Sequence, residues 1–306
     1  MSLIVTGTIG IDTIYTPAGE HREGVLGGSC AYFAAAASFY GPVRLVAAVG
    51  DDFPPEHRAT LAKFKNIDAA GLEVREGSKT FRWGGKYLED MDHRESLFTE
   101  LNILAEAPPA VPESFKDSSY VFLANMHPGL QGELLSQMKS PKLAVADTMD
   151  LWIDIAKDDL ENLLGRVDGL VLNYDEAEQF TGKRNPVTAG RALLERGPTF
   201  VVVKKGEHGA ILVHRDGVAA LPAYPAEVVV DPTGAGDTFA GGMMGHLAAT
   251  DPENPADYDT IRRALAHGTI IASFTIETFS LERLASITPA QIGDRYDRFA
   301  AMTHLA

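Results

Sequence analysis

The stretch Glu227–Gly242, EVVVDPTGAGDTFAGG, joins a β-branched run, a glycine-bearing turn and the start of a helix. The run Val228–Val230 predicts a strand. Phe239, Met243 and Leu247 recur at a spacing that places all three on one face of a helix. A strand that passes through a tight turn into a helix is the basic step of a sheet covered by helices. The stretch therefore indicates an α/β protein.

The turn Gly234-Ala235-Gly236 has the chemistry of an anion site. The first N–H groups of a helix have no partner within it, and the helix dipole adds positive potential there. Small side chains let a phosphate approach these amides closely. Asp237 follows directly and is placed to accept a proton from an attacking hydroxyl, while the amides stabilise charge on a transferred phosphoryl group. The alternative is that Asp237 is only a helix cap after turn glycines.

Short apolar runs separated by helical patterns recur along the chain, and most are apolar at consecutive positions, as in strands covered on both faces. The other expected strands are Leu3–Val5, Arg44–Val49, Tyr120–Leu123, Leu143–Ala146, Leu170–Leu172, Phe200–Val203 and Ala210–Val213. The expected helices are Ala31–Tyr40, Glu56–Phe64, Leu130–Met138, Leu151–Leu164, Asp175–Phe180, Ala189–Glu195, Phe239–Leu247, Tyr258–Phe274 and Pro289–Met302. This alternation predicts a doubly wound, mostly parallel sheet with helices on both faces.

Two segments, at about 13–25 and 75–104, interrupt this alternation. The second contains Thr80–Tyr87 and Glu95–Leu104, whose composition favours a β-ribbon over a helix. We expect both segments to form one small β lobe at the sheet edge, which acts as a lid, as a homodimer contact, or as both. Because no repeat, low-complexity tract or linker divides the chain, we expect residues 1–306 to form a single domain.

Composition narrows the possible partners. The chain has 27 basic and 42 acidic residues, a formal charge of −15, which disfavours nucleic acid and anionic membranes as main partners. The single cysteine, Cys30, excludes an intramolecular disulfide, and we expect it to be a small buried residue. We find neither a signal-peptide pattern nor an apolar run of membrane-spanning length, and we expect a cytoplasmic protein.

The string Asp231–Phe239 resembles the C-terminal signature of the ribokinase (PfkB) carbohydrate kinase family. The resemblance extends over nearly the whole chain, through five further segments in the order of the family. These are Gly7–Asp12, Gly27-Gly28, Asn173–Glu176, Lys204–Gly209 and Ala266-His267. It implies a ribokinase-like fold and ATP-dependent phosphorylation of a hydroxyl on a sugar, sugar-like or nucleoside acceptor.

The resemblance also assigns roles at the reacting centre. Asp237 is the implied general base, and the amides of Gly234-Ala235-Gly236 hold the transferred γ-phosphoryl group. The implied acceptor-binding residues are Asp12 and Gly27-Gly28, although an Asx turn also explains Asp12. Tyr32 stands where ribokinase-like members carry a sugar-binding asparagine. Its ring either stacks on a base or ring of the acceptor, or packs the helix on the sheet.

The implied nucleotide site begins with Asn173 and Glu176, which offer hard oxygen atoms three residues apart. They suit Mg²⁺ held largely through water, and they also fit a helix cap with its reciprocal partner, so both roles can hold. The remaining implied ATP contacts are Lys204, Gly206 and Gly209 in one turn and His267 beside the adenine. A lysine at a strand end is more commonly solvated, and a helix histidine is more commonly packed.

The family's monovalent-cation site uses the loop around Asp231 and Thr233, together with a glycine-bearing loop after the adenine helix. Here the second loop is Thr275–Ser280, TIETFS, without that glycine. We therefore do not expect potassium activation, and whether Glu277 substitutes or no ion binds stays open.

Two alternatives to a sugar or nucleoside kinase also stay open. One is a kinase for a heteroaromatic alcohol such as a vitamin precursor, a chemistry that the same superfamily hosts. The other is a regulatory ligand-binding protein that kept the fold and lost catalysis, against which the intact GAGD run argues. A nicotinamide dinucleotide site and a P-loop are not supported, because neither GxGxxG nor GxxxxGK[ST] is present.

Overall fold

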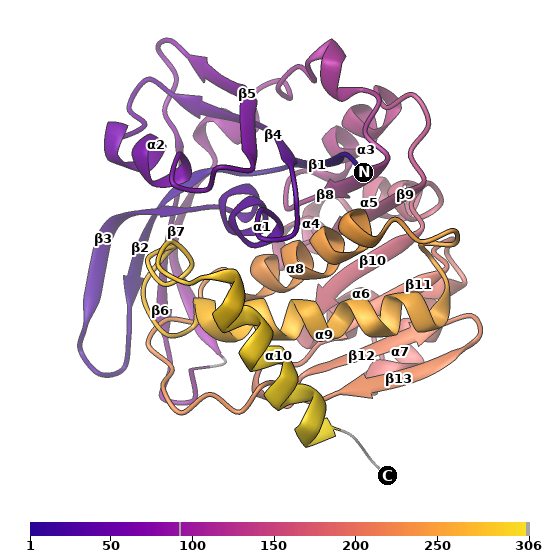
Figure 1. Ribbon diagram of the computed structural model, residues 1–306. Helices are drawn as coiled ribbons and strands as arrows, with labels where there is room; N and C mark the ends of the chain where they lie inside the picture. The colour runs from indigo at the N-terminus through magenta and orange to yellow at the C-terminus, as the bar shows by residue number, and fades with distance from the viewer. Residues whose placement is uncertain (92, 304–306) are drawn as a thin grey trace.

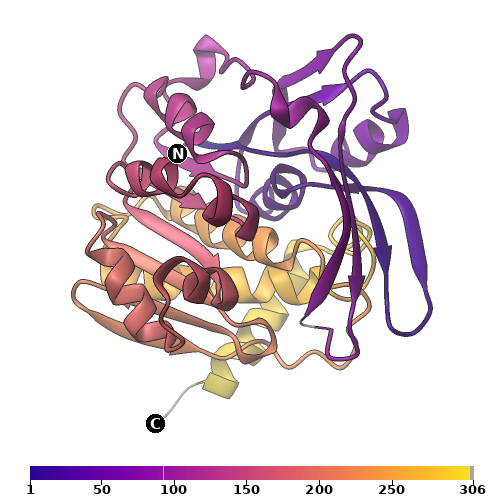
Figure 2. The same ribbon diagram turned by 180° about the vertical axis from the view of Figure 1, so that it is seen from behind.

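The computed structural model describes residues 1–91 and 93–303, which form two β-sheets of unequal size. Figure 1 and Figure 2 show the larger sheet crossing the molecule with helices on both of its faces, and the smaller sheet projecting from one side. The arrangement confirms the predicted α/β class with an additional small β lobe.

The larger sheet has nine strands in the order β13-β12-β11-β10-β9-β8-β1-β4-β5. Neighbouring strands are parallel from β11 to β5, and β12 and β13 form an antiparallel edge. The strands are β1 (Leu3–Thr6), β4 (Val43–Gly50), β5 (Ile67–Arg75), β8 (Tyr120–Leu123), β9 (Leu143–Asp147), β10 (Gly169–Asn173), β11 (Phe200–Lys204), β12 (Ala210–His214) and β13 (Gly217–Leu221). The strand order reverses at β1, and ligands bind at such switch points in open α/β sheets.

Two groups of helices cover this sheet. The group in front in Figure 1 is α1 (Ser29–Ala37), α8 (Ala235–Thr250), α9 (Tyr258–Thr275) and α10 (Pro289–Thr303). The group in front in Figure 2 is α3 (Pro128–Ser136), α4 (Asp150–Ile155), α5 (Lys157–Leu164), α6 (Tyr174–Thr181) and α7 (Pro186–Leu194). The remaining helices are α2 (Pro55–Leu61) and the 3-10 turns η1 (Asn102–Ala105), η2 (Glu113–Phe115) and η3 (Gly206–His208).

Alternation along the strands divides the core between the two faces. Leu3 and Val5 of β1 belong to the apolar cluster under α1, α8 and α9, whereas Ile4 belongs to the cluster under α3, α5, α6 and α7. All three side chains are fully buried. Continuous apolar runs are therefore strands with both faces covered, as predicted.

Glycines of α8 allow the close approach of its neighbours. A Cβ on Gly241 would lie 2.4 Å from the carbonyl oxygen of Phe33 in α1, and one on Gly242 would lie 2.8 Å from that of His267 in α9. These positions therefore require glycine, because a side chain would meet the backbone of a neighbouring helix. This packing fixes α8, and with it the turn at its N-terminus, against the core.

The smaller sheet has four strands in the order β3-β2-β6-β7. They are β2 (Gly10–Tyr15), β3 (His21–Gly27), β6 (Phe81–Tyr87) and β7 (Arg94–Glu100), with β2 and β6 parallel and the outer pairs antiparallel. The expected strand Glu95–Leu104 is wrong at its end, because the chain turns into η1 after Glu100.

Two further predictions of secondary structure are wrong. Val228–Val230 is not a strand: Val228 and Val229 are exposed, and the amide of Val230 donates to Ile276 of a loop rather than to a strand. The expected single helix Leu151–Leu164 is broken at Ala156, whose backbone is not helical. The break lets α4 bury Trp152 independently of α5.

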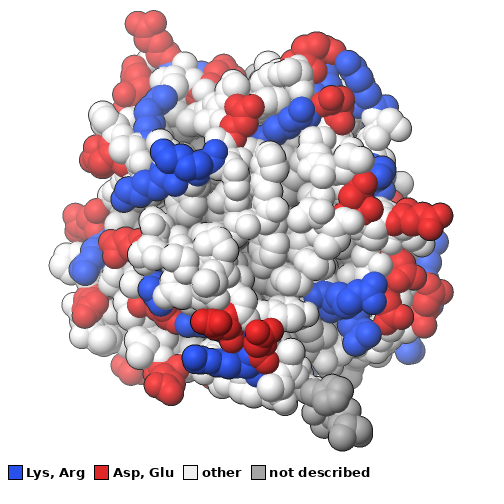
Figure 3. All heavy atoms as spheres, in the orientation of Figure 1, with Lys and Arg blue, Asp and Glu red and all other residues white. Residues whose placement is uncertain are grey.

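Charges of both signs are interspersed around the face shown in Figure 3, with no broad basic patch over it. Within 1–91 and 93–303, no helix has both the length and the apolar character needed to cross a membrane.

Candidate functional site

A cavity of about 1000 Å³ lies at the carboxyl ends of the central strands and is bordered by the smaller sheet. The residues proposed from sequence that line it are Asp12, Gly28, Tyr32, Asn173, Glu176, Lys204, Gly206, Gly234, Ala235, Gly236 and Asp237. They come from segments more than 200 residues apart, so the fold brings together most of the proposed acceptor and nucleotide residues.

The turn before α8 has the geometry that an anion site requires. Gly234 caps the helix with a left-handed backbone, at φ +75°. A Cβ at this position would lie 2.3–2.4 Å from atoms of the Tyr32 ring, so space as well as conformation requires glycine. Ala235, Gly236 and Asp237 form the first helical turn, where backbone N–H groups are available to a ligand.

Asp237 lies in this turn among charges of both signs. Burial raises its pKa above the ordinary value, while the charges of Lys204 and Arg94 oppose the shift. The Lys204 ammonium lies against the turn itself, because a Cβ on Gly236 would be 2.6 Å from Nζ. A buried carboxylate with a raised pKa is a stronger base, and the positive charges of Lys204 and Arg94 favour its ionised form.

Arg94, which the sequence did not single out, lines the cavity from β7 of the smaller sheet. Its charge lowers the pKa of Glu176 as well as that of Asp237. Its place in the β lobe expected at about 75–104 was the one available signal, although the strand there was expected to begin one residue later, at Glu95.

Asp12 lines the same cavity from β2 of the smaller sheet. Its side chain is 4% exposed, and its Oδ1 atom has no hydrogen-bond partner in the described part of the chain. Burial first, and then the charges of Asp231 and Asp237, raise its pKa to about 8. Gly27 lies directly behind it: a Cβ there would be 1.9 Å from Asp12 Oδ2, so this glycine provides space for the carboxylate.

Tyr32 both packs and lines the cavity. It is 1% exposed, with its ring against Gly234, and its hydroxyl has no partner among the described residues. Burial and the nearby charges of Asp231 and Asp12 raise its pKa, so the hydroxyl keeps its proton. The hydroxyl is therefore available to donate a hydrogen bond to a ligand in the cavity.

Asn173 and Glu176 form a reciprocal cap at the start of α6. Asn173 Oδ1 accepts from the Glu176 amide at 2.8 Å, and Glu176 Oε2 accepts from the Asn173 amide at 2.7 Å. The cap fixes Glu176 at the cavity wall, and one of its two carboxylate oxygens is occupied by the hydrogen bond from the Asn173 amide. Burial raises its pKa.

Asp147, at the end of β9, is a cavity residue that sequence reasoning missed. It is 4% exposed, its Oδ1 atom is unpaired among the described residues, and burial followed by the charge of Asp237 raises its pKa. Its position at a carboxyl strand end was the available signal. Two buried carboxylates, Asp147 and Glu176, are hard oxygen donors that fit Mg²⁺. Within the described ranges no group of three or more His, Cys, Asp or Glu side chains is placed to enclose a metal ion.

Gly27, Gly209 and His267 are proposed residues that do not line the cavity. Gly209 has φ +83° in the turn between β11 and β12. His267 stacks between His246, at a ring distance of 3.7 Å, and Tyr296, at 4.6 Å. Its Nδ1 lies 3.3 Å from the Tyr40 hydroxyl, and burial lowers its pKa to about 4. The structure therefore places this histidine in a packed contact between helices.

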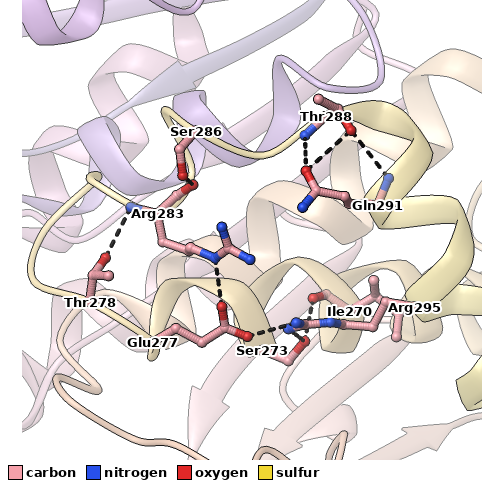
Figure 4. Close-up of polar contacts among 9 residues, drawn as sticks. All are labelled: Ile270, Ser273, Glu277, Thr278, Arg283, Ser286, Thr288, Gln291 and Arg295. Carbon is pink, nitrogen blue, oxygen red and sulfur yellow. Dashed lines mark hydrogen bonds and ion pairs between the residues drawn. The ribbon is translucent and has the colours of Figure 1, made fainter.

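The Glu277 carboxylate is committed to two arginines, as Figure 4 shows. One oxygen accepts from Arg283 Nε and the other from Arg295, each at 2.6 Å. The Arg295 guanidinium also lies 3.5 Å from the centre of the Phe274 ring. The neighbouring Ile276 carbonyl accepts from the amides of Val230 and Asp231, so this network supports the segment that leads into the anion turn.

Comparison with known proteins gives consistent matches. Residues 12–285 match the pfkB family of carbohydrate kinases. The sequence is 32% identical over 252 residues to the cytidine kinase of Thermococcus kodakarensis, covering 80% of this chain and 87% of that protein. It is 29% identical over 227 residues to the nucleoside kinase of Methanothermobacter thermautotrophicus, covering 71% and 70%.

Solved structures share the fold. The nucleoside kinase of Methanocaldococcus jannaschii superposes with a TM-score of 0.76 at 20% identity, covering 97% of this chain and 98% of that one. The nucleoside kinase of Burkholderia thailandensis in complex with inosine gives a TM-score of 0.77 at 19% identity, covering 98% and 99%.

Proposed function

This chain belongs to the pfkB family of carbohydrate kinases and is a phosphotransferase with a hydroxyl acceptor, and we propose that it transfers the γ-phosphoryl group of ATP to a nucleoside. The observation that carries the proposal is one cavity lined both by Asp12 and by the turn of Asp237 beside Lys204. The relatives named cytidine kinase and nucleoside kinase support a nucleoside over a simple sugar.

Asp12 and Tyr32 are the proposed binding groups for the ribose. The unpaired Asp12 oxygen accepts hydrogen bonds, and the unpaired Tyr32 hydroxyl donates one, so together they suit neighbouring sugar hydroxyls. Both groups are nearly fully buried, and leaving them unsatisfied is costly, which favours an acceptor that pairs with them. The primary hydroxyl of the ribose then lies towards Asp237.

Asp237 is the proposed general base. The acceptor hydroxyl gives its proton to the carboxylate as its oxygen forms a bond to the γ-phosphorus, and the bond between that phosphorus and the leaving oxygen of ADP breaks. Amides of the turn at Gly234–Gly236 stabilise the charge on the transferred group, and Lys204 and Arg94 add positive charge on two sides.

Magnesium, when bound with ATP, neutralises charge on the phosphates, and Asp147 and Glu176 are the residues that would hold it together with water. Their burial and raised pKa values mean that a cation stabilises their ionised forms. The smaller sheet acts as a lid whose closure excludes water, so that the acceptor rather than water reacts.

The edge strand β7 of the smaller sheet is also our proposed contact for a second copy of the chain. All of its residues are exposed, including Leu97 and Phe98, and unpaired edge strands with apolar side chains favour association. Light scattering that shows only monomer at tens of micromolar, with or without ATP, would contradict the homodimer.

The test is a coupled ADP-release assay with ATP and Mg²⁺ against nucleosides, sugars, sugar phosphates, polyols and heteroaromatic alcohols, with Asp237→Asn alongside. We expect turnover with a nucleoside and a loss of about 10²–10⁴-fold in the variant, the usual contribution of a general base. Calorimetry should show that Asp237→Asn still binds ATP.

Other results would redirect the proposal. Turnover with a heteroaromatic alcohol alone would favour the vitamin-type alternative. No turnover with any compound of the panel, while ATP still binds, would favour the regulatory alternative. An Asp237→Asn variant as fast as the parent would show that another group takes the proton.

A further inference from the structure

The cavity wall contains a side-chain amide, that of Asn125, whose orientation is fixed. Asn125 follows β8, is partly buried and lines the cavity. Its Oδ1 atom accepts from Trp152 Nε1 at 2.8 Å. An indole N–H only donates, so the amide oxygen must face Trp152 and the amide nitrogen must point the other way.

The Asn125 nitrogen has donor capacity left for a ligand. Nδ2 lies 3.2 Å from the Met149 sulfur, and a thioether is a weak acceptor for one of its two hydrogens. No second acceptor for this nitrogen is recorded in the described part of the chain. The buried hydroxyl of Thr148, also at the cavity wall, has no partner among these residues either. The wall therefore presents polar groups that the protein leaves unsatisfied.

The surroundings of Asn125 suit a flat ring. Phe81 and Trp83 line the same cavity from the smaller sheet, and Met149 lines it from the end of β9. Aromatic and thioether side chains pack well on the faces of a heterocycle, while the amide and hydroxyl are available to its edge. A wall with apolar groups and a few placed polar groups is typical of a specific small-molecule site.

Strand order places this wall at the acceptor end. Lys204 ends β11 and Asn173 ends β10, on the side proposed for the nucleotide, whereas β8 lies next to β1. Asn125 is thus nearer to the acceptor-binding segments than to Lys204. A ribose held by Asp12 leaves its base free to extend along this wall.

We infer that Asn125 donates a hydrogen bond to a ring carbonyl of the nucleobase, so that the enzyme prefers oxo-bases such as those of cytidine, uridine and inosine over adenine. The inference rests on the proposed nucleoside acceptor and deepens it. Trp152 is a positioning residue that stops the amide from turning its oxygen towards the base. Adenine has no exocyclic carbonyl oxygen. Its acceptors are ring nitrogens, which project less far from the ring than a carbonyl oxygen does, so we expect adenine to pair less well with the Asn125 amide.

The test compares kcat/KM for cytidine and adenosine in the parent enzyme and in Asn125→Asp, Asn125→Leu and Trp152→Phe. We expect the parent to favour cytidine by about tenfold or more, the scale set by one unpaired buried donor. Both Asn125 variants should lose that preference, mainly through the KM for cytidine. Trp152→Phe frees the amide to flip and should lower the cytidine-to-adenosine ratio by a smaller factor.

Matched readouts separate the possible failures. The KM for ATP and the melting temperature of each variant show whether the nucleotide site and the fold survive. The inference is overturned if the parent uses both nucleosides equally, or if folded Asn125 variants keep the parent's ratio. Phosphorylation of sugars but of no nucleoside would instead overturn the proposed function, and the inference with it.

Discussion

The phenolic oxygen of Tyr87 lies 3.0 Å from the hydroxyl oxygen of Thr233. Tyr87 ends β6 of the smaller sheet, and Thr233 precedes the left-handed Gly234 of the anion turn. Tyr87 is 4% exposed and packs with Ile14 and Phe279. The proposed lid and the proposed phosphoryl site are therefore joined by a partly buried hydrogen bond.

Replacing Tyr87 by Phe should lower kcat by about 2–10-fold, the value of one hydrogen bond, because the turn loses a support from the lid. Steady-state kinetics with the acceptor identified by the panel measures this. A double-mutant cycle with Thr233→Val is the control, since two partners of one bond should not have additive effects. Additive losses would mean that the two hydroxyls act separately.

Gly234→Ala and Gly236→Ala form a matched pair within one turn. At Gly234 the new methyl meets the buried Tyr32 ring and a left-handed backbone, whereas at Gly236 it meets the movable end of Lys204. We expect turnover to fall about 10²–10³-fold for Gly234→Ala, as for loss of an oxyanion donor, and much less for Gly236→Ala. Equal losses in kcat would show that the Tyr32 contact does not decide the effect.

Asp12 should make the free protein less stable as pH rises. Its folded pKa of about 8 lies above the ordinary 3.8, so the folded state holds this proton more tightly than the unfolded chain does. The associated stability is complete below about pH 4 and is lost as pH rises through about 8. Asp12→Asn should therefore gain melting temperature over the parent increasingly across this range, while its acceptor KM rises.

The melting temperatures of the parent and of Asp12→Asn, measured without ligand at several pH values, test this prediction. The matched control is Asp297→Asn, at an exposed position on α10. A constant difference for Asp12→Asn would contradict the buried, protonated carboxyl.

Lys204→Gln should move the acid limb of the pH–rate profile to higher pH. The Lys204 charge lowers the pKa of both Asp237 and Asp147, so its removal raises the pH at which the base loses its proton. The KM for ATP should also rise, since a positive charge is lost beside the phosphates. Lys205→Gln is the control, because Lys205 is not among the charges that act on Asp237. An unchanged acid limb in Lys204→Gln would argue against this coupling.

Local pattern predicted the central sheet well. Runs such as Tyr120–Leu123 are apolar at every position because helices cover both faces, and this signal does not depend on distant residues. Edge elements were predicted poorly. The edge strand β5, with sequence IDAAGLEVR, combines low β-propensity with partial exposure. It is a strand because its backbone pairs with that of β4. Val228–Val230 has high β-propensity but no neighbouring strand to pair with among the described residues, and its backbone is irregular.

The anion turn could be identified from sequence because its physics is local: small residues, a helix N-terminus and an acid lie within a few positions of one another. Asp12 and Glu176 were found because each lies within a short contiguous motif, Gly7–Asp12 and Asn173–Glu176. Arg94, Asn125 and Asp147 were not, because they lie in separate parts of the chain and none belongs to a short contiguous motif.

The sequence by itself determined the α/β class, the family and the position of the proposed phosphoryl-binding turn, because each depends on periodicity or on a short contiguous motif. Only the tertiary structure decided that Arg94 approaches Asp237, that Trp152 orients Asn125 and that His267 lies outside the cavity. The burial of a side chain, the charges that act on it and the orientation of an amide depend on which helices and strands are in contact. Strand order and helix packing determine those contacts, and both depend on the whole chain.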